Sequence, residues 1–324
     1  MNSNKKNTLS VLVELLQFEE DSKSRSSSKY EIKETRITSK EFLLQYPRGA
    51  YTTVRTVKRN SIMDLQGHGR LVEESEIVTK ALEKFRDCKV FKNLLIELLK
   101  IGLKKYYEIE EEKGVGETKV TLIACYSFQE SRPRMAAQFS PLHAPNSPRC
   151  KVEVYGEPRK HAWAKDSQWV RERKRLEETM HPGFNEIILT DSNTHNIYEG
   201  LSSNFFAVIY NPDTKQPLVV TAPLSVVLEG TIMKIVKMIC GRDNIDFKYW
   251  FPNTQDVHLW EGAFITSTTR LVLPIELIKF RDGMPIAKLP PNNDTVEYIK
   301  QEVEKEIFNR AYRILKDDDL TENG

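Results

Sequence analysis

Residues 197–208 read Ile-Tyr-Glu-Gly-Leu-Ser-Ser-Asn-Phe-Phe-Ala-Val, the most specific stretch of the chain. Within it, Gly200 predicts a tight turn, Ser203 and Asn204 supply short polar groups, and a buried strand is expected to follow. Glu199 would then lie at the lip of a sheet, where a carboxylate is seldom placed without a partner. A solvated acid in a turn is the simpler interpretation, and residues elsewhere in the chain have to decide between the two.

Turn-linked strands and single helices are predicted on both sides of this stretch. Strands are expected at 30–57, 119–127, 186–189, 205–210, 218–220 and 271–280 and near Phe247 and Phe264. Helices are expected early in 1–30, at 71–85, at 91–111, at 231–239 and at 294–315, and residues 129–150, with four prolines, read as a loop. These patterns predict an α+β protein with mixed or antiparallel sheets.

Composition narrows the class of protein. The 324 residues include 48 Lys+Arg and 46 Asp+Glu, a formal net charge of +2 that gives no reason to expect a nucleic-acid partner. The hydrophobic fraction of 40% argues against global disorder. No apolar run approaches the roughly 18 residues of a membrane span. Four cysteines without C-x-x-C spacing predict free thiols in a cytoplasmic protein and indicate no metal site.

The predicted organisation has three parts. Residues 1–30 form a mobile extension, residues 31–150 a small N-terminal domain with an interdomain loop, and residues 151–324 a larger C-terminal domain. The proline-rich loop at 129–150 is expected to separate the two larger parts.

Several residues outside the opening stretch could carry chemistry. Lys165 lies between Trp163 and Trp169, and an apolar setting disfavours the ammonium form, so that the neutral amine could attack a carbonyl. Residues 266–269 place four hydroxyls at the end of an apolar strand, and residues 228–231 open a helix whose free N–H groups could hold an anion. The alternatives are a solvent-facing lysine and ordinary turn caps.

Five blocks, taken in order, resemble the class-IV aminotransferases, the fold-type-IV pyridoxal-phosphate enzymes. That family includes branched-chain aminotransferase, D-amino acid aminotransferase and aminodeoxychorismate lyase. The blocks are residues 49–56, His68-Gly-Arg70-Leu71, Lys165, Glu199-Gly-x-x-Ser203-Asn204-x-Phe206 and residues 266–269. Lys165 precedes Glu199 by 34 residues, close to the family interval between the Schiff-base lysine and the acid that pairs with the pyridine nitrogen.

The resemblance implies a fold and a set of site residues. The fold is two-domain α+β, with a small α/β N-terminal domain and a larger barrel-like C-terminal domain, in a homodimer. Lys165 and Glu199 are the implied catalytic residues. The implied contacts to pyridoxal 5′-phosphate are Arg70, Lys165, Glu199, Ser203, Asn204, Gly230, Thr231, Ser267 and Thr268. The candidate substrate contacts are Tyr51, Arg132 and Arg134, although the two arginines also fit a solvated loop.

The function that the resemblance implies is transfer of an amino group between an amino acid and a 2-oxo acid. Two alternatives remain open from the sequence. One is an elimination like that of aminodeoxychorismate lyase, and the other is a cofactor-binding protein that has lost turnover. We expect small-molecule substrates and neither a nucleic-acid nor a membrane partner.

Overall fold

The computed structural model divides the chain into two compact units, which we call unit 1 and unit 2. It describes residues 8–19, 27–65, 88–111, 114–211, 214, 216–281, 283, 285–317 and 319. Unit 1 comprises Met1–His143, Lys165–Arg171 and Arg310–Gly324, and unit 2 comprises Ala144–Ala164 and Glu172–Asn309. Neither unit is one continuous segment. The predicted three-part division, with boundaries at residues 30 and 150, stays a prediction.

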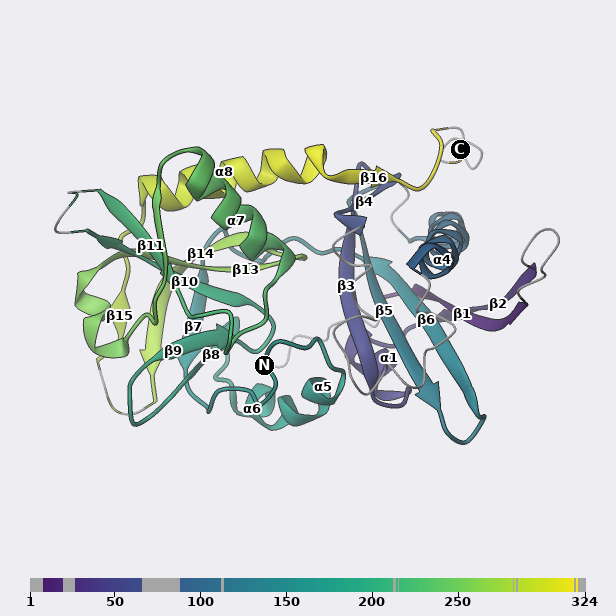
Figure 1. Ribbon diagram of the computed structural model, residues 1–324, viewed down its shortest axis with the longest axis horizontal. Coiled ribbons are helices and arrows are strands. Elements are labelled where there is room, and N and C mark those ends of the chain that lie inside the picture. The colour runs from purple at the N-terminus through teal and green to yellow at the C-terminus, as the bar shows by residue number, and fades with distance from the viewer. Residues whose placement is uncertain are drawn as a thin grey trace. The chain divides into compact units, whose positions relative to one another are not determined.

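Unit 1 is built on one antiparallel sheet, in the order β16-β4-β3-β5-β6-β1-β2. Its strands are β1 Ser10–Glu19, β2 Ser27–Thr35, β3 Gly49–Val57, β4 Ser61–Met63, β5 Thr118–Ser127, β6 Arg132–Pro141 and β16 Ala311–Arg313. Its helices are α1 Ser39–Leu44 and α4 Cys88–Ile109, and α5 Gln168–Glu172 ends at the boundary with unit 2. Helix α4 packs against β1 and β6, as Figure 1 shows.

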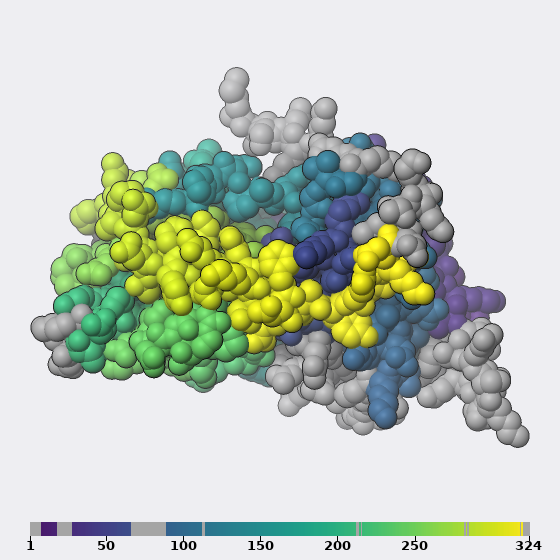
Figure 2. All heavy atoms as spheres, turned by 90° about the horizontal axis from the view of Figure 1, so that it is seen from above, coloured from purple at the N-terminus to yellow at the C-terminus, as the bar shows by residue number. Residues whose placement is uncertain are grey.

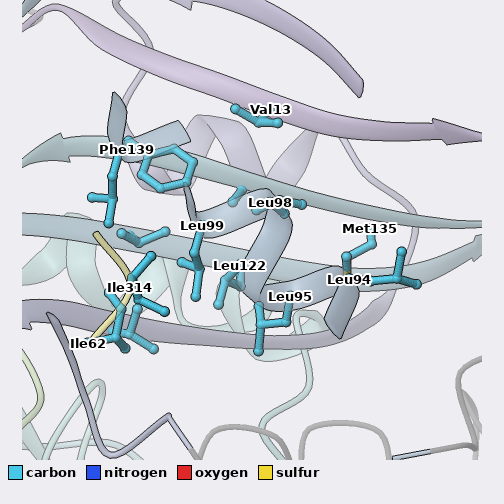
Figure 3. Packing of buried hydrophobic residues seen from close by; sticks show 14 of the residues in the cluster. Val13, Ile62, Leu94, Leu95, Leu98, Leu99, Leu122, Met135, Phe139 and Ile314 are labelled. Atoms are coloured by element: carbon cyan, nitrogen blue, oxygen red, sulfur yellow. The ribbon is translucent and has the colours of Figure 1, made fainter. Parts of the chain in front are cut away.

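Helix α4 supplies the main hydrophobic core of unit 1. Leucines at helical spacing form one apolar face, and Leu94, Leu95, Leu98 and Leu99 are all buried. They pack with side chains of the sheet, among them Phe139, and Figure 3 shows this packing from close by. Gly102 lies where the helix comes closest to β6, because a Cβ atom there would lie 2.0 Å from the Phe139 ring. The sheet and α4 can approach this closely only with glycine at that position.

Unit 2 contains a closed six-stranded barrel. The described strands of unit 2 are β7 Cys150–Val154, β8 Glu186–Thr190, β9 Ile197–Gly200, β10 Asn204–Tyr210, β11 Pro217–Thr221, β12 Asp246–Tyr249, β13 Trp260–Ser267, β14 Leu271–Phe280 and β15 Ala287–Lys288, and β11, β12 and β15 lie outside the ring. The ring runs β10-β13-β14-β7-β8-β9 and closes where β9 pairs with β10, Glu199 opposite Asn204. Closure leaves these strands without an open edge and fixes the ends of β9, β10 and β13 relative to one another.

Helices cover the barrel from outside. They are α6 Lys174–Thr179, α7 Thr231–Arg242 and α8 Asp294–Asn309, with a 3₁₀ turn at Thr254–Leu259. Helices α7 and α8 pack against each other, α7 also contacts β13, and α8 contacts β13 and β14. Figure 2 shows α8, in yellow, on the surface of this unit. The α+β class and the barrel-like second half, both predicted from the sequence, are confirmed.

Several predicted elements are confirmed in type and place, among them α4, α7 and strands β5, β8, β10 and β14. The helix predicted at 294–315 is confirmed as α8 but ends at Asn309, because residues 311–313 form strand β16, which pairs with β4. The helix expected early in the chain is wrong, because residues 10–19 form strand β1. Val11 and Val13 face the α4 core while Leu12 faces a cluster on the opposite side of the sheet. A strand covered on both faces has a continuous apolar sequence, which periodicity alone does not distinguish from a helix. The helix predicted at 71–85 lies outside the described residues.

The proline-rich segment 129–150 is also not the continuous loop that was expected, because strand β6 occupies residues 132–141. Only residues 136–139 of β6 are paired on both sides, with β5 and with β1. Pro133 and Pro141 lie outside that part, where a missing amide hydrogen costs least. Residues 39–44, expected as strand, form helix α1, and its capping box between Thr38 and Glu41 was a usable sequence signal.

Replacing Gly102 by alanine should lower the free energy of unfolding by about 1–3 kcal/mol, because the new methyl group must push Phe139 aside. The measurement is chemical denaturation of the purified protein. Gly241→Ala in α7 is the matched control, since a Cβ atom there meets nothing within 4 Å. At a helical glycine in open space, alanine should leave the free energy of unfolding unchanged or raise it by up to about 1 kcal/mol. Equal effects at the two positions would contradict the packing described.

Candidate active site

Glu199 is buried at the point where the barrel closes. It is 4% exposed, so the interpretation as a solvated turn acid is wrong. Its Oε1 atom accepts a hydrogen bond from Nε of Arg159 at 2.8 Å and lies 2.8 Å from Nη2 of the same guanidinium. Its Oε2 atom accepts from the backbone N–H of Leu228 at 3.1 Å. Both carboxylate oxygens therefore have donors that fix their positions, as a buried carboxylate requires.

Arg159 is a site residue that the sequence did not reveal. Its side chain is 7% exposed, and its Nη2 atom also donates to the carbonyl oxygen of Ala162 at 2.7 Å. In the sequence it is the first residue of the basic run Arg159-Lys160-His161, which has the composition of an exposed loop. Only the buried partner Glu199 distinguishes it from its neighbours.

The main-chain N–H and carbonyl groups of Leu228 join Glu199 to the start of helix α7. Its N–H binds Glu199, and its carbonyl oxygen accepts from the Asn204 side chain at 2.7 Å and from the N–H of Gly230 at 2.9 Å. A Cβ atom on Gly230 would lie 2.3 Å from Oδ1 of Asn204, so this position has no room for a side chain. The predicted cofactor contacts Glu199, Asn204 and Gly230 are thus brought together within unit 2.

Helix α7 begins at Thr231 without a side-chain cap at Gly230. The first intrahelical bond of the helix runs from the N–H of Lys234 to the carbonyl oxygen of Gly230. The preceding N–H groups of the first turn point out of the helix end, where the helix dipole favours an anion. Gly230 and Thr231 lie at this uncapped helix end, and their predicted role as phosphate contacts stays a prediction.

A turn rich in hydroxyls follows strand β13. Thr266 is paired with Asn204 across β13 and β10, and among the described residues its buried Oγ1 atom has no hydrogen-bond partner. The Ser267 hydroxyl accepts from the N–H of Arg270 at 3.2 Å and lies 3.4 Å from the Thr269 hydroxyl. The predicted residues Ser267 and Thr268 lie on this turn. An orphaned buried hydroxyl beside it is what a site lacking its ligand would show.

Ser203 is bound to a buried carboxylate in this structure, and its predicted contact with the cofactor stays a prediction. Its hydroxyl donates to Oε2 of Glu186 at 3.1 Å, as does that of Ser202 at 2.8 Å. Gly200 needs to be glycine, because a Cβ atom there would lie 2.3 Å from Oγ of Ser203. The tight turn predicted from the sequence is present, closed by a 2.7 Å bond from the N–H of Gly200 to the carbonyl oxygen of Ser203.

Lys165 belongs to unit 1 and is held there by strand β3. Its carbonyl oxygen accepts from the N–H of Tyr51 at 3.0 Å, and the N–H of Ser167 donates to Gly49 at 2.9 Å. The Nζ atom of Lys165 lies 5.6 Å from the centroid of the Tyr51 ring. A cation over an aromatic face is stabilised by the ring quadrupole. Two of the predicted residues, the lysine and Tyr51, are therefore neighbours.

Arg134 is paired inside unit 1. Its Nε and Nη2 atoms bind the two oxygens of Glu14 at 2.6 and 2.8 Å, and the Tyr46 hydroxyl donates to the same carboxylate at 2.8 Å. Burial raises the pKa of Glu14, but the hydrogen bonds from Arg134 and Tyr46 outweigh it and hold that pKa below its ordinary value. Arg132 pairs with Glu130 at 2.7 Å. A substrate role for either arginine stays a prediction, and Arg70 lies outside the described residues.

Comparison with known families identifies the class of protein. The profile described as amino-transferase class IV matches residues 49–278, and the chain belongs to the class-IV aminotransferase family. A search among curated proteins finds no match. No group of three or more potential metal ligands is found among the described residues, and no described helix is long and apolar enough to cross a membrane.

Solved aminotransferase structures share the fold. The branched-chain aminotransferase of the archaeon Thermoproteus uzoniensis, solved with norvaline, has 16% identity and a TM-score of 0.67 over 88% of this chain and 97% of that one. The Escherichia coli branched-chain amino acid aminotransferase has 12% identity and a TM-score of 0.64 over 84% and 92%. A hypothetical aminotransferase from Mycobacterium tuberculosis, in its PLP-bound form, has 15% identity and a TM-score of 0.61 over 81% and 89%.

Replacing Arg159 by glutamine should lower the free energy of unfolding by about 3–5 kcal/mol, because it leaves the Glu199 carboxylate buried without its charged partner. Adding Glu199→Gln should recover part of that loss, since the remaining pair is neutral. Chemical denaturation of the two single variants and the double variant measures the coupling between them. Strictly additive effects would show that the two side chains do not form the pair described.

Proposed function

We propose that this protein transfers an amino group between an amino acid and a 2-oxo acid with pyridoxal 5′-phosphate as cofactor. The observation that carries the proposal is the linkage through Leu228. It joins a buried, oriented carboxylate to an uncapped helix N-terminus within unit 2. A pyridine nitrogen and a phosphate at opposite ends of one small ligand would require this combination. Family membership and the shared fold support the same assignment.

The residues present fit this cofactor. We assign the phosphate to the first-turn N–H groups of α7 that begin at Thr231, where Gly230 allows a close approach, to the hydroxyls of Ser267 and Thr268, and to Arg70. Ser203 and Asn204 complete the proposed set by shaping the turn between β9 and β10. The Mycobacterium tuberculosis aminotransferase was solved in a PLP-bound form and in a form with α-ketoglutarate and PMP, which supports the same ligand class here.

When bound, pyridoxal phosphate supplies an electron sink for the negative charge that develops at the substrate Cα. In our proposal Lys165 would hold the cofactor's aldehyde carbon through its amine, with loss of water, and would carry the Cα proton as a general base. Glu199 holds a proton on the ring nitrogen, which strengthens the electron sink. Arg159 and the N–H of Leu228 keep the Glu199 carboxylate in place for that role.

The substrate side of the proposal involves residues of unit 1. Tyr51, beside Lys165, is proposed to face the substrate. Arg132 and Arg134 are proposed to bind a carboxylate, in competition with Glu130 and Glu14, to which they are now bound. A carboxylate ligand suits the bidentate geometry of a guanidinium.

We also propose a homodimer in the cytoplasm. The location is supported by the buried free thiols of Cys125, Cys150 and Cys240. The dimer follows from the family resemblance, in which the site lies near the subunit contact.

Lys165 should carry the cofactor covalently. We expect borohydride reduction of the protein with pyridoxal phosphate to place the label on the peptide that contains Lys165, because a neutral amine near an aldehyde forms a reducible bond. Peptide mapping by mass spectrometry is the measurement. Lys165→Ala should abolish labelling, and Lys174→Ala, at an exposed lysine, should leave it unchanged. A label on Lys174 or on another lysine would remove Lys165 from this role.

A single half-reaction should distinguish transamination from the alternatives. With excess amino donor and no acceptor, we expect pyridoxamine phosphate to accumulate and a 2-oxo acid to convert it back. Glu199→Gln should retain the cofactor and slow this step by about 10²-fold, since an amide cannot keep the ring nitrogen protonated. Absorbance and chromatography of the released cofactor measure both.

Two other outcomes would each replace the proposal. Pyruvate release from aminodeoxychorismate, with the cofactor unchanged afterwards, would indicate an elimination. A wild-type protein that binds pyridoxal phosphate but shows no half-reaction across a broad panel of donors would be a binding protein without turnover.

A further inference from the structure

A second buried carboxylate, Glu186, lies at the same end of the barrel as Glu199 and outside the proposed cofactor contacts. It is the first residue of β8 and is 4% exposed. Its Oε2 atom accepts from the hydroxyls of Ser202 and Ser203 and lies 3.0 Å from Nη2 of Arg270. Three donors on one oxygen make Glu186 the centre of a polar cluster that includes the turn after β9.

Arg270 brings the second turn into the same cluster. Its Nη2 atom donates to the Ser202 hydroxyl at 2.8 Å as well as contacting Glu186. Its backbone N–H donates to the hydroxyl of Ser267, one of the proposed phosphate contacts. One arginine thus connects the turn at 201–203 to the turn at 267–270 through both its side chain and its main chain.

The backbone beside Arg270 shows that this turn needs to be held. Leu271 has a φ of +55°, in the left-handed region that a residue with a Cβ atom adopts only at a cost. Among the described residues, the Nη1 atom of Arg270 is buried and lacks a hydrogen-bond partner, which is a further cost. Both features cost free energy. A role for the Arg270 charge at this site would explain why an arginine occupies the position.

We propose that Arg270 and Glu186 form a positioning pair that sets where Ser267 and Thr268 meet the cofactor's phosphate. The pair does this by tying the turn that carries these hydroxyls to the turn at 201–203, which leads into Asn204. The proposal rests on the proposed function for the identity of the ligand. The tie itself is a property of the chain without ligand.

The test compares Arg270→Gln with a matched control on the same strand. Arg281 follows the opposite end of β14 and pairs with the buried carboxylate of Glu153, so Arg281→Gln removes a similar ion pair away from the turns. Hydrogen–deuterium exchange without ligand reports on the backbone of 201–203 and 266–271. Titrations with pyridoxal phosphate and with pyridoxal, which lacks the phosphate, separate an effect on phosphate from general damage.

We expect Arg270→Gln to speed exchange in both turns and to raise the Kd for pyridoxal phosphate by about tenfold, the effect of weakening one charge-assisted contact. The Kd for pyridoxal should change much less, and Arg281→Gln should alter neither turn. Adding Glu186→Gln to Arg270→Gln should add little, because the two residues act together. Should Arg270→Gln fail to fold, Ser202→Ala removes one link of the tie and should give a smaller change in the same direction.

Unchanged exchange in both turns of a folded variant would show that Arg270 does not hold the two turns together. Two results would overturn the positioning role. One is faster exchange with an unchanged Kd for pyridoxal phosphate, and the other is an equal rise in the Kd values for pyridoxal phosphate and for pyridoxal. A wild-type protein that binds no pyridoxal phosphate would instead contradict the proposed function, and the exchange measurement would still decide whether Arg270 ties the turns.

Discussion

The rest of the candidate site depends on the main-chain N–H and carbonyl groups of Leu228. The N–H donates to the Glu199 carboxylate, and the carbonyl oxygen accepts from the Asn204 side chain and the N–H of Gly230. Hydrogen bonds on both sides of one residue therefore link the carboxylate to the start of α7. A ligand that needs an acid at one end and an anion cradle at the other meets a preformed frame, which lowers the entropic cost of binding.

Closure of the barrel explains why this frame is rigid. Glu199 lies opposite Asn204 where β9 pairs with β10, and Asn204 lies opposite Thr266 where β10 pairs with β13. A shift of register between β9 and β10 would separate the Glu199 carboxylate from the Asn204 amide. A shift between β10 and β13 would separate that amide from the Thr266 hydroxyl. The two buried carboxylates at this end, Glu199 and Glu186, each pair with an arginine. Buried charges are tolerated only with such partners, so Arg159 and Arg270 follow from the acids that the site contains.

The sequence predicted the residues of this site that form a pattern of side-chain types. It did not predict the contacts that depend on main-chain groups or on partners distant in the sequence. The interval between Lys165 and Glu199, the helix after Gly230 and the hydroxyls at 266–269 are visible as residue types at fixed spacing. The role of Leu228 cannot be predicted from the sequence, because main-chain N–H and carbonyl groups are common to nearly all residues. Arg159 was missed for a related reason, since its importance comes from a partner 40 residues away in the sequence. In the fold, β1 was mistaken for a helix because both faces of its sheet are covered.

The most direct test of this account is a crystal structure of the protein grown with pyridoxal 5′-phosphate. The account predicts the phosphate at the first turn of α7, beside Gly230 and Thr231. It also predicts the ring nitrogen within hydrogen-bonding distance of Glu199, about 2.7–3.2 Å, while Arg159 still binds the same carboxylate. A phosphate bound elsewhere, or a Glu199 carboxylate that faces only Arg159 and Leu228 while the ring nitrogen lies away from it, would contradict the central claim.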